Sequence, residues 1–331
     1  MSSLSTAQTI LSIAQDCTIY ISFIILIGGL LGNTCIIITI SRLKFLRKNS
    51  SSFYLISESI ANSIILIIPY SFRIGINGFN YDPSQTSVVW CKLRQTFGQM
   101  CILISMSLVC FAAIDQYLST NHRPYLRLMS SLKLAQYLTA CAIFIWILHS
   151  IPFIAFLEIQ QSNGCNLYNN VLINYITYIY YPILCGILPI IISSIFSLLA
   201  FTNVRQIVRR QMPVFRRRLD RQMTSMILIR VIFLIIFTLP NTIQRIYALI
   251  VPADPNDLIG AALEQLVGVI TISLFYCHVS CSFYIFIISS RRFRRQVKYV
   301  FFKKCWKPNR KRTACVYPAA VGSCVLSNEL N

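Results

Sequence analysis

The stretch LRQTFGQMCILISMSLVCFAAIDQYL, residues 93–118, decides the fold of this chain. Between Arg94 and Asp115 it runs for 20 residues without a charged side chain. An α-helix rises about 1.5 Å per residue, so a run of this length covers the ~30 Å hydrocarbon core of a bilayer. Because backbone groups in lipid must be hydrogen-bonded internally, we predict that these residues form a membrane-spanning helix.

Six further apolar runs meet the same test of length and charge. In chain order they are residues 19–40, 53–72, 134–156, 171–201, 223–250 and 262–288. The composition agrees, since 56% of the residues are hydrophobic and 12% are charged, where a soluble domain has about 25% charged residues. We therefore predict an all-α bundle of seven transmembrane helices, and we exclude an ordinary soluble enzyme.

Basic residues are concentrated in every second connection between the runs. The chain has 30 Lys and Arg against 10 Asp and Glu, a formal net charge of +20. When the seven runs are numbered along the chain, with residues 93–118 as run three, most of the basic residues follow runs one, three, five and seven. By the positive-inside rule these connections face the cytosol, so we expect the amino terminus outside and the carboxyl terminus inside. This arrangement is typical of topology signals and contacts with lipid headgroups, and it does not indicate nucleic-acid binding.

This topology divides the chain into four parts. We expect residues 1–18 to be a short extracellular segment, 19–290 the seven-helix domain, 291–304 an amphipathic helix on the cytosolic membrane surface, and 305–331 a disordered tail. No lysine or arginine precedes Arg42, so the first run lacks the charged start of a cleavable signal peptide and is expected to stay as an anchor. The expected location is the plasma membrane.

Two of the 13 cysteines lie on the predicted extracellular side. Cys91 is at the outer start of run three, and Cys165 is midway between runs four and five. Because this side is oxidising, we predict a disulfide that pins the loop across the mouth of the bundle. On the cytosolic side, Cys305 follows the arginine-rich stretch, where it is either acylated or a free thiol. The spacing of possible ligands predicts no metal site, and we expect no cofactor.

Short motifs follow one another in order along the runs. Run one contains Gly32-Asn33, run three ends in Asp115-Gln116-Tyr117, run six contains Pro240, and run seven ends in Ser282-Phe283-Tyr284-Ile285-Phe286. Together with the cysteine pair, they resemble the rhodopsin-like family of G-protein-coupled receptors. The segment in run seven looks like a degenerate Asn-Pro-x-x-Tyr motif. Its phenylalanine in place of proline is similar to the motif of invertebrate neuropeptide receptors. The resemblance implies a receptor for an extracellular peptide that signals to heterotrimeric G proteins through cytosolic loops two and three.

Several positions at which the resemblance implies an activation switch carry other residues. Gln116 replaces the motif arginine, so with Asp220, near the inner end of run six, it can form only an ordinary hydrogen bond and not a charged lock. Asn62 replaces the aspartate of a sodium site, so we expect no strong sodium regulation, with Ser105 and Ser282 as its neighbours. The implied switch residues are Asp115, Gln116, Tyr117, Asp220, Asn62, Pro240, Ser282 and Phe286.

Two charged residues lie within the predicted spans, Glu58 in run two and Arg230 in run six. Ionisable groups inside a span are functional candidates unless they reach the membrane surface. We expect both to lie near the cytosolic end and to extend their charged groups to the headgroups.

The outer halves of the runs supply polar side chains for a ligand pocket. Gly98 stands where amine receptors have an aspartate, and no lysine lies between Lys133 and Lys298 to hold retinal, so we expect neither a biogenic amine nor retinal. The resemblance implies that the pocket layer contains Gln95, Gln99, Tyr181, Asn241, Arg245 and Tyr276, and the outer halves of runs two and three add Arg73 and Arg94.

The three arginines of this set have two interpretations. Arg73, Arg94 and Arg245 can accept a carboxylate or an acidic peptide group through charge-assisted hydrogen bonds. Alternatively, each faces headgroups or the outer acids, which are Asp254, Asp257 and Glu264.

Other classes of function are weaker matches to the sequence. A transporter would show paired interrupted helices and charges near the midplane, whereas the runs are nearly free of charge and neither half repeats the other. A membrane enzyme would need catalytic groups at close spacing, and the three histidines are scattered, so we predict no catalytic site. A receptor that binds ligand but couples weakly stays open, because Gln116 departs from the coupling motif.

Overall fold

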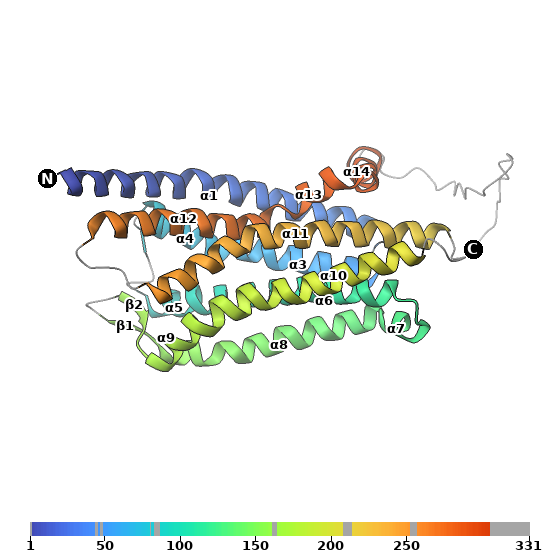
Figure 1. Ribbon diagram of the computed structural model, residues 1–331, viewed down its shortest axis with the longest axis horizontal. Coiled ribbons are helices and arrows are strands. Elements are labelled where there is room, and N and C mark those ends of the chain that lie inside the picture. The colour runs from blue at the N-terminus through green and yellow to red at the C-terminus, as the bar shows by residue number, and fades with distance from the viewer. Residues whose placement is uncertain are drawn as a thin grey trace.

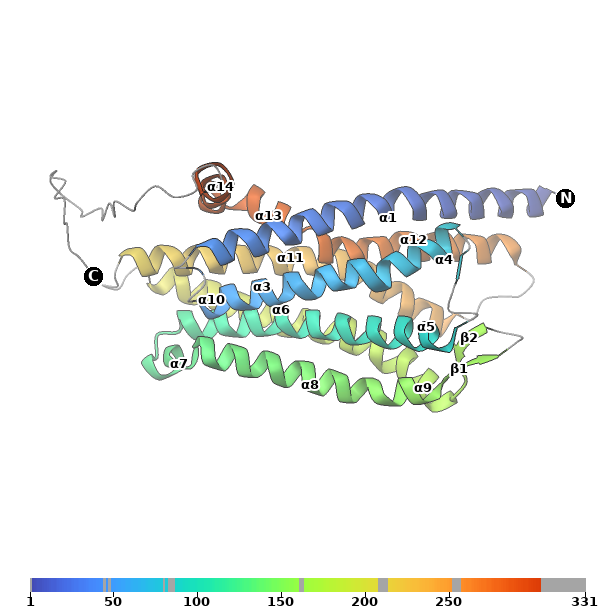
Figure 2. The ribbon, with the colours of Figure 1, turned by 180° about the vertical axis from the view of Figure 1, so that it is seen from behind.

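The computed structural model describes residues 2–43, 46, 49–79, 81–82, 87–160, 164–207, 214–251 and 257–304. Within these residues, seven helical spans are long and apolar enough to cross a membrane. They run alongside one another in an elongated bundle (Figures 1 and 2). The predicted all-α bundle of seven spans is confirmed.

Each span is a single helix or a series of consecutive helical pieces. The first four are α1 (Ser2–Arg42); α3 (Ser50–Ile65), a π-helical segment (Leu66–Tyr70) and α4 (Ser71–Phe79); α5 (Val88–Lys92), a π-helical segment (Leu93–Phe97) and α6 (Gly98–Thr120); and α8 (Leu132–Phe156). The last three are α9 (Asn170–Tyr175), a π-helical segment (Ile176–Ile187) and α10 (Leu188–Ile207); α11 (Val214–Ile250); and α12 (Leu258–Ser280) followed by α13 (Ser282–Ser289).

Two of the π-helical segments contain a proline, Pro69 in the second span and Pro182 in the fifth. Proline has no amide hydrogen and its ring collides with the preceding turn, so the regular ladder of hydrogen bonds is interrupted there. A wider π-helical turn accommodates the interruption. Pro69 lines a cavity between the helices, together with Tyr180 and Tyr181, the two residues that precede Pro182.

A short hairpin closes one end of the bundle. Strand β1 (Leu157–Gln160) pairs antiparallel with β2 (Gly164–Leu167), and Ile159 lies opposite Cys165. Cys165 is bonded to Cys91 of α5, with the two Cα atoms 5.6 Å apart. The predicted disulfide is therefore present and ties the hairpin to the third span. We call this end, with β1, β2, α5 and the start of α1, the hairpin end.

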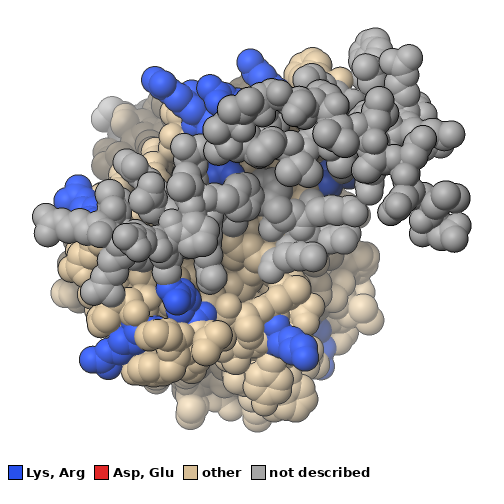
Figure 3. Space-filling model, turned by 90° about the vertical axis from the view of Figure 1, so that its right-hand side faces the viewer, with Lys and Arg blue, Asp and Glu red and all other residues tan. Residues whose placement is uncertain are grey.

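The opposite end carries α7 (Pro124–Met129), α14 (Arg291–Lys298) and a final π-helical segment (Tyr299–Lys304). Lysine and arginine side chains project from several places on this face, as Figure 3 shows. We call it the basic end. The amphipathic surface helix predicted for residues 291–304 corresponds to α14 and the segment after it.

Helix α1 is longer than the sequence predicted. The apolar run begins at residue 19, but the helix begins at Ser2. Its first turns pack on neighbours, since Ala7, Ala14 and Thr18 are buried and Gln15 Nε2 donates to the carbonyl of Gly78 in α4 at 2.7 Å. Hydropathy marks the part of a helix that can lie in lipid, and packing extends the helix beyond it.

Close packing joins the first and seventh spans. Gly29 of α1 lies so near α12 that an added Cβ would collide with the Ser280 hydroxyl and with Leu66. One turn further on, Asn33 Nδ2 donates to the carbonyl of Val279 at 3.2 Å. A small residue and one hydrogen bond thus bring the two backbones together, as is common between helices in membranes.

Candidate functional site

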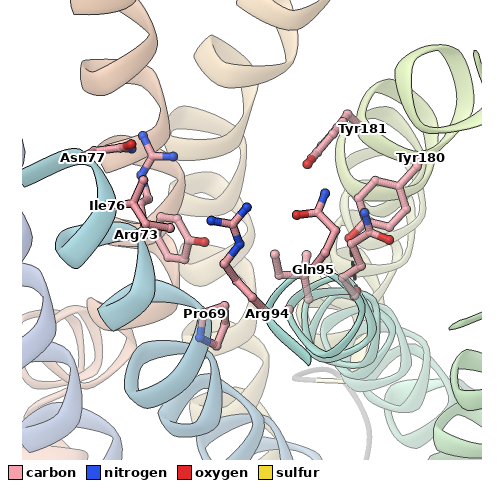
Figure 4. Close-up of a pocket in the computed structure, with 12 residues that line it drawn as sticks. Pro69, Arg73, Ile76, Asn77, Arg94, Gln95, Tyr180 and Tyr181 are labelled. Carbon is pink, nitrogen blue, oxygen red and sulfur yellow. Dashed lines mark hydrogen bonds between the residues drawn. The ribbon is translucent and has the colours of Figure 1, made fainter. Parts of the chain in front are cut away.

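A cavity of about 320 Å³ opens between the second, third, fifth and seventh spans at the hairpin end. Figure 4 shows the polar ends of Arg73, Arg94, Gln95 and Tyr181 directed into it. Most of the predicted pocket residues line this cavity, namely Arg73, Arg94, Gln95, Gln99, Tyr181 and Tyr276. These six side chains come from four different spans.

A second cavity of about 770 Å³ adjoins the first. Residues of α1, α4, α11 and α12 line it, and Arg73 and Asn77 belong to both cavities. Arg245 lines this second cavity and not the first. Asn241, which was also predicted to line the pocket, lines neither of the two, and its Oδ1 is buried without a hydrogen-bond partner among the described residues.

The three arginines of the pocket differ in the groups that their guanidinium groups contact. Arg94 forms an ion pair with Asp82, with Nη1 and Oδ2 3.4 Å apart. The guanidinium of Arg245 lies over the ring of Tyr181, 4.6 Å from its centroid. Arg73 forms neither a hydrogen bond nor an ion pair with the residues that the structure describes.

The outer acids mostly do not pair with these arginines. Glu264 lines the second cavity, but no ion pair joins it to an arginine within the described ranges. Asp257 caps α12 by accepting a hydrogen bond from the Gly260 amide at 2.8 Å. Asp254 lies outside the described residues. The acid that pairs with an arginine is Asp82, which the sequence analysis did not consider for this role.

The walls of the first cavity are polar and aromatic. Gln99 is 6% exposed, and neither atom of its side-chain amide has a hydrogen-bond partner in the described part of the chain. The ring of Tyr276 lies 4.2 Å from the ring of Tyr70, between centroids. A ligand that enters can therefore satisfy a buried amide that the protein leaves without partners.

At the basic end, Asp115 is held by three serine hydroxyls from two other segments. Ser50 and Ser51, at the start of α3, donate to its Oδ2 at 2.8 and 2.6 Å, and Ser130, after α7, donates to its Oδ1 at 2.7 Å. These serines were not predicted from the sequence. The run Asn49-Ser50-Ser51-Ser52 at the beginning of a span was the available signal, because it offers several hydroxyls at one depth.

Gln116, next to Asp115, connects three spans. Its Oε1 accepts a hydrogen bond from Ser51 of α3 at 3.1 Å, and its Nε2 donates to Thr224 of α11 at 2.6 Å. The side chain of Asp220, the partner expected from the sequence, lies outside the described residues. Tyr117 packs on Phe196 of α10, with ring centroids 5.5 Å apart. A neutral amide therefore bridges the second, third and sixth spans.

The chain matches the model of the 7 transmembrane receptor (rhodopsin family) over residues 32–284. It belongs to that family. No curated protein matches the chain significantly. The match to this family and the seven spans identify the chain as a multi-pass membrane receptor. The family implies an extracellular ligand and a G-protein partner.

The position of the family's sodium site in this receptor is occupied by an amide. Asn62 Oδ1 accepts a hydrogen bond from Ser105 of α6 at 2.6 Å. Ser282, its other expected neighbour, is buried, and its hydroxyl has no hydrogen-bond partner within the described ranges. Asn62 Nδ2 instead points towards Glu58 Oε1, 3.4 Å away.

The prediction that Glu58 and Arg230 extend to the membrane surface is wrong. Glu58 of α3 and Arg230 of α11 form an ion pair with each other, and the two residues are 1% and 6% exposed. Pairing removes the need for either charge to reach water, since each neutralises the other. His278 of α12 is also buried close enough to feel the charge of Arg230.

The remaining switch positions lie along the sixth and seventh spans. Helix α11 continues through Pro240. Phe286 is fully buried and packs against Phe293 of α14, with ring centroids 5.8 Å apart, so it anchors the surface helix.

Cys305, the predicted acylation site, lies outside the described residues. The described residues contain no group of three or more possible metal ligands.

Proposed function

We propose that this receptor binds an extracellular peptide at the hairpin end and signals to heterotrimeric G proteins from the basic end, in the plasma membrane. Two features support this orientation. The Cys91–Cys165 disulfide is stable in an oxidising compartment, which supports an extracellular position for the hairpin end. The basic connections and α14 then face the cytosol, in agreement with the positive-inside rule.

The observation that carries the proposal is the pair of adjoining cavities. They measure about 320 and 770 Å³ and receive polar side chains from most of the spans. Pockets for drug-sized molecules measure about 300–1,000 Å³, so the two together accept a larger, extended ligand. A peptide fits because its backbone and side chains need several hydrogen-bonding groups along its length.

The basic end contains the elements that a G-protein partner would release. Gln116 holds α11 through Thr224 and α3 through Ser51, so all three spans are tied at this end. An outward movement of α11 breaks the bond to Thr224 and exposes the inner ends of the spans. In this proposal, cytosolic loops two and three receive the partner.

The absence of a charge at Gln116 favours one alternative, a receptor that binds its ligand but couples weakly. An arginine forms charge-assisted hydrogen bonds with a partner's carbonyl groups, whereas a glutamine forms neutral ones of about half that strength. The bond from Gln116 to Thr224 also has to be given up when α11 moves outward.

Second-messenger output in cells that are exposed to a peptide library tests the proposal. We compare wild type, Gln116→Arg and Cys91→Ala at matched surface amounts, with Cys141→Ala as the control for loss of a free cysteine. We expect wild type and Cys141→Ala to respond and Cys91→Ala to lose the response. A response from Gln116→Arg alone would favour weak coupling, and silence from all four variants would contradict the proposal.

A further inference from the structure

The hairpin-end cavities contain positive charge that the described protein groups do not neutralise by contact. Arg94 is paired with Asp82, but Arg73 and Arg245 have no carboxylate within ion-pair distance among the described residues. The Nε of Arg245 is buried without a hydrogen-bond partner in the same part of the chain. Buried donors of this kind cost free energy until an acceptor reaches them.

Arg73 and Arg245 come from different spans and both line the second cavity. Arg73 comes from α4 and borders both cavities, and Arg245 comes from α11 and borders the second. The two guanidinium groups lie within electrostatic range of each other and of Tyr181 and Tyr276. Since like charges repel, an anion placed between them lowers the energy of both.

The surroundings favour one kind of anion. Arg245 is stacked on Tyr181, which holds its planar guanidinium in one orientation, and such a group binds a carboxylate through two parallel hydrogen bonds. Gln99 adds a side-chain amide without partners in the described structure at the wall of the first cavity. Glu264, at the wall of the second cavity, repels a doubly charged group such as phosphate more strongly than a singly charged carboxylate.

We propose that the receptor recognises a carboxylate on its ligand and holds it between Arg73 and Arg245. This inference rests on the proposed function, because it describes the ligand of the same site. In a peptide the carboxylate is the free carboxyl terminus or an Asp or Glu side chain. The remaining length of the peptide then lies along the second cavity, against α1 and α12.

Thermal unfolding of the purified receptor in nanodiscs of neutral lipid tests this without any signalling readout. The probes are hippurate, which combines an aromatic ring with a carboxylate, and its neutral amide, hippuramide. We expect hippurate to raise the unfolding midpoint in a concentration-dependent way, and hippuramide to have a much smaller effect. We expect the affinity for hippurate to fall roughly tenfold or more in Arg73→Gln and in Arg245→Gln.

Three controls make the result specific. Arg123→Gln removes an exposed arginine at the basic end and should leave hippurate binding unchanged. Arg94→Gln should weaken binding less than Arg73→Gln, because the charge of Arg94 is already paired with Asp82. Arg73→Lys, which keeps the charge but not the planar fork, should keep part of the preference for the acid.

Measurements without ligand show whether the variants fold. Arg73→Gln relieves repulsion between two like charges, so its midpoint should be at least that of wild type. The inference is overturned if hippurate and hippuramide stabilise the receptor equally, if neither stabilises it, or if the effect of hippurate survives both substitutions. A peptide response in cells without a preference for carboxylates would overturn the inference and leave the receptor function intact.

Free-acid and amidated versions of each active peptide separate the two sources of the carboxylate. If amidation abolishes the response, the carboxyl terminus is the group that is bound. If the response survives amidation but not the replacement of Asp or Glu by Asn or Gln, an acidic side chain is bound.

Discussion

Glu58 in α3 and Arg230 in α11 form an ion pair inside the bundle, although they are 172 residues apart in the sequence. Glu58 also lies beside Asn62, which accepts a hydrogen bond from Ser105 of α6. These contacts connect the second, third and sixth spans at a level between the two ends. They hold α11 against α3 independently of Gln116.

Removing one partner of this pair should be far more harmful than removing both. Arg230→Met or Glu58→Leu leaves a lone buried charge, which costs about 3–5 kcal/mol, whereas the double replacement leaves an apolar contact that is close to neutral. Unfolding midpoints of the purified receptor measure this. Arg291→Met, at an exposed arginine of α14, is the control. A double variant as unstable as the sum of its two single variants would show that the charges do not compensate each other.

The double variant Glu58→Leu/Arg230→Met should also signal more strongly in the absence of ligand. The ion pair is a contact between α3 and α11 that an outward movement of α11 has to break, so its loss shifts the population towards the active state. Basal second-messenger output at matched surface amounts is the measurement. Basal output equal to that of wild type would mean that the pair is kept in both states.

Gln116 and Thr224 should show a measurable coupling energy. Both form further contacts, so the single variants Gln116→Leu and Thr224→Val differ in their total cost. The double-mutant cycle isolates the bond between Gln116 Nε2 and Thr224 Oγ1, for which we expect about 0.6–1.7 kcal/mol, as for other bonds between membrane helices. Free energies of unfolding in detergent give the four corners of the cycle. If the effects of the two substitutions are additive, this bond does not stabilise the resting state.

Reduction should lower the stability of the receptor through one disulfide. The Cys91–Cys165 bond closes a loop with a sequence separation of 74, and its loss is expected to cost about 2–5 kcal/mol. The unfolding midpoint of wild type should therefore fall when a reductant is added, and the midpoint of Cys91→Ala/Cys165→Ala should not change. Sensitivity of the double variant to reductant would point to another oxidised cysteine.

Two neighbouring glycines of α1 should respond differently to alanine. At Gly29 the new methyl group collides with Ser280 and Leu66, and overpacking of this kind costs about 1–3 kcal/mol. At Gly28 the nearest atom is the Tyr284 hydroxyl, 3.6 Å away, which is an ordinary contact. Unfolding midpoints should be lower for Gly29→Ala and nearly unchanged for Gly28→Ala. Equal midpoints would mean that α1 and α12 can move apart at no cost.

The seven spans were predictable because each requires a long apolar run, and that requirement is local. The beginning of α1 at Ser2 was not, because the residues before position 19 are held by packing on α4 and α12. The ion pair escaped prediction since no spacing in the sequence relates Glu58 to Arg230. Their opposite charges at a similar depth were the available signal.

The pocket was predicted from the outer position of its residues and from the family resemblance, and neither specifies how far a cavity reaches between the helices. Arg73, Gln99 and Tyr276 line the first cavity as expected. Asn241 lines neither cavity, because it lies one turn of α11 further from the hairpin end than Arg245, on the same face of the helix. The pairing of Arg94 with Asp82 also depends on how the chain continues after α4, which no pattern in the sequence specifies.

The length of α1 should affect the rates at which a ligand binds and leaves. Its 41 residues extend about 60 Å, roughly twice the thickness of the hydrocarbon core. The first turns, with Gln8, Leu11 and Gln15, form one wall of the second cavity, and in the proposed orientation they extend beyond the hydrocarbon core on the extracellular side. A wall of this height narrows the directions from which a ligand can arrive and obstructs its departure. We expect both rates to be lower for this reason, so that a bound ligand gains residence time without a single additional hydrogen bond.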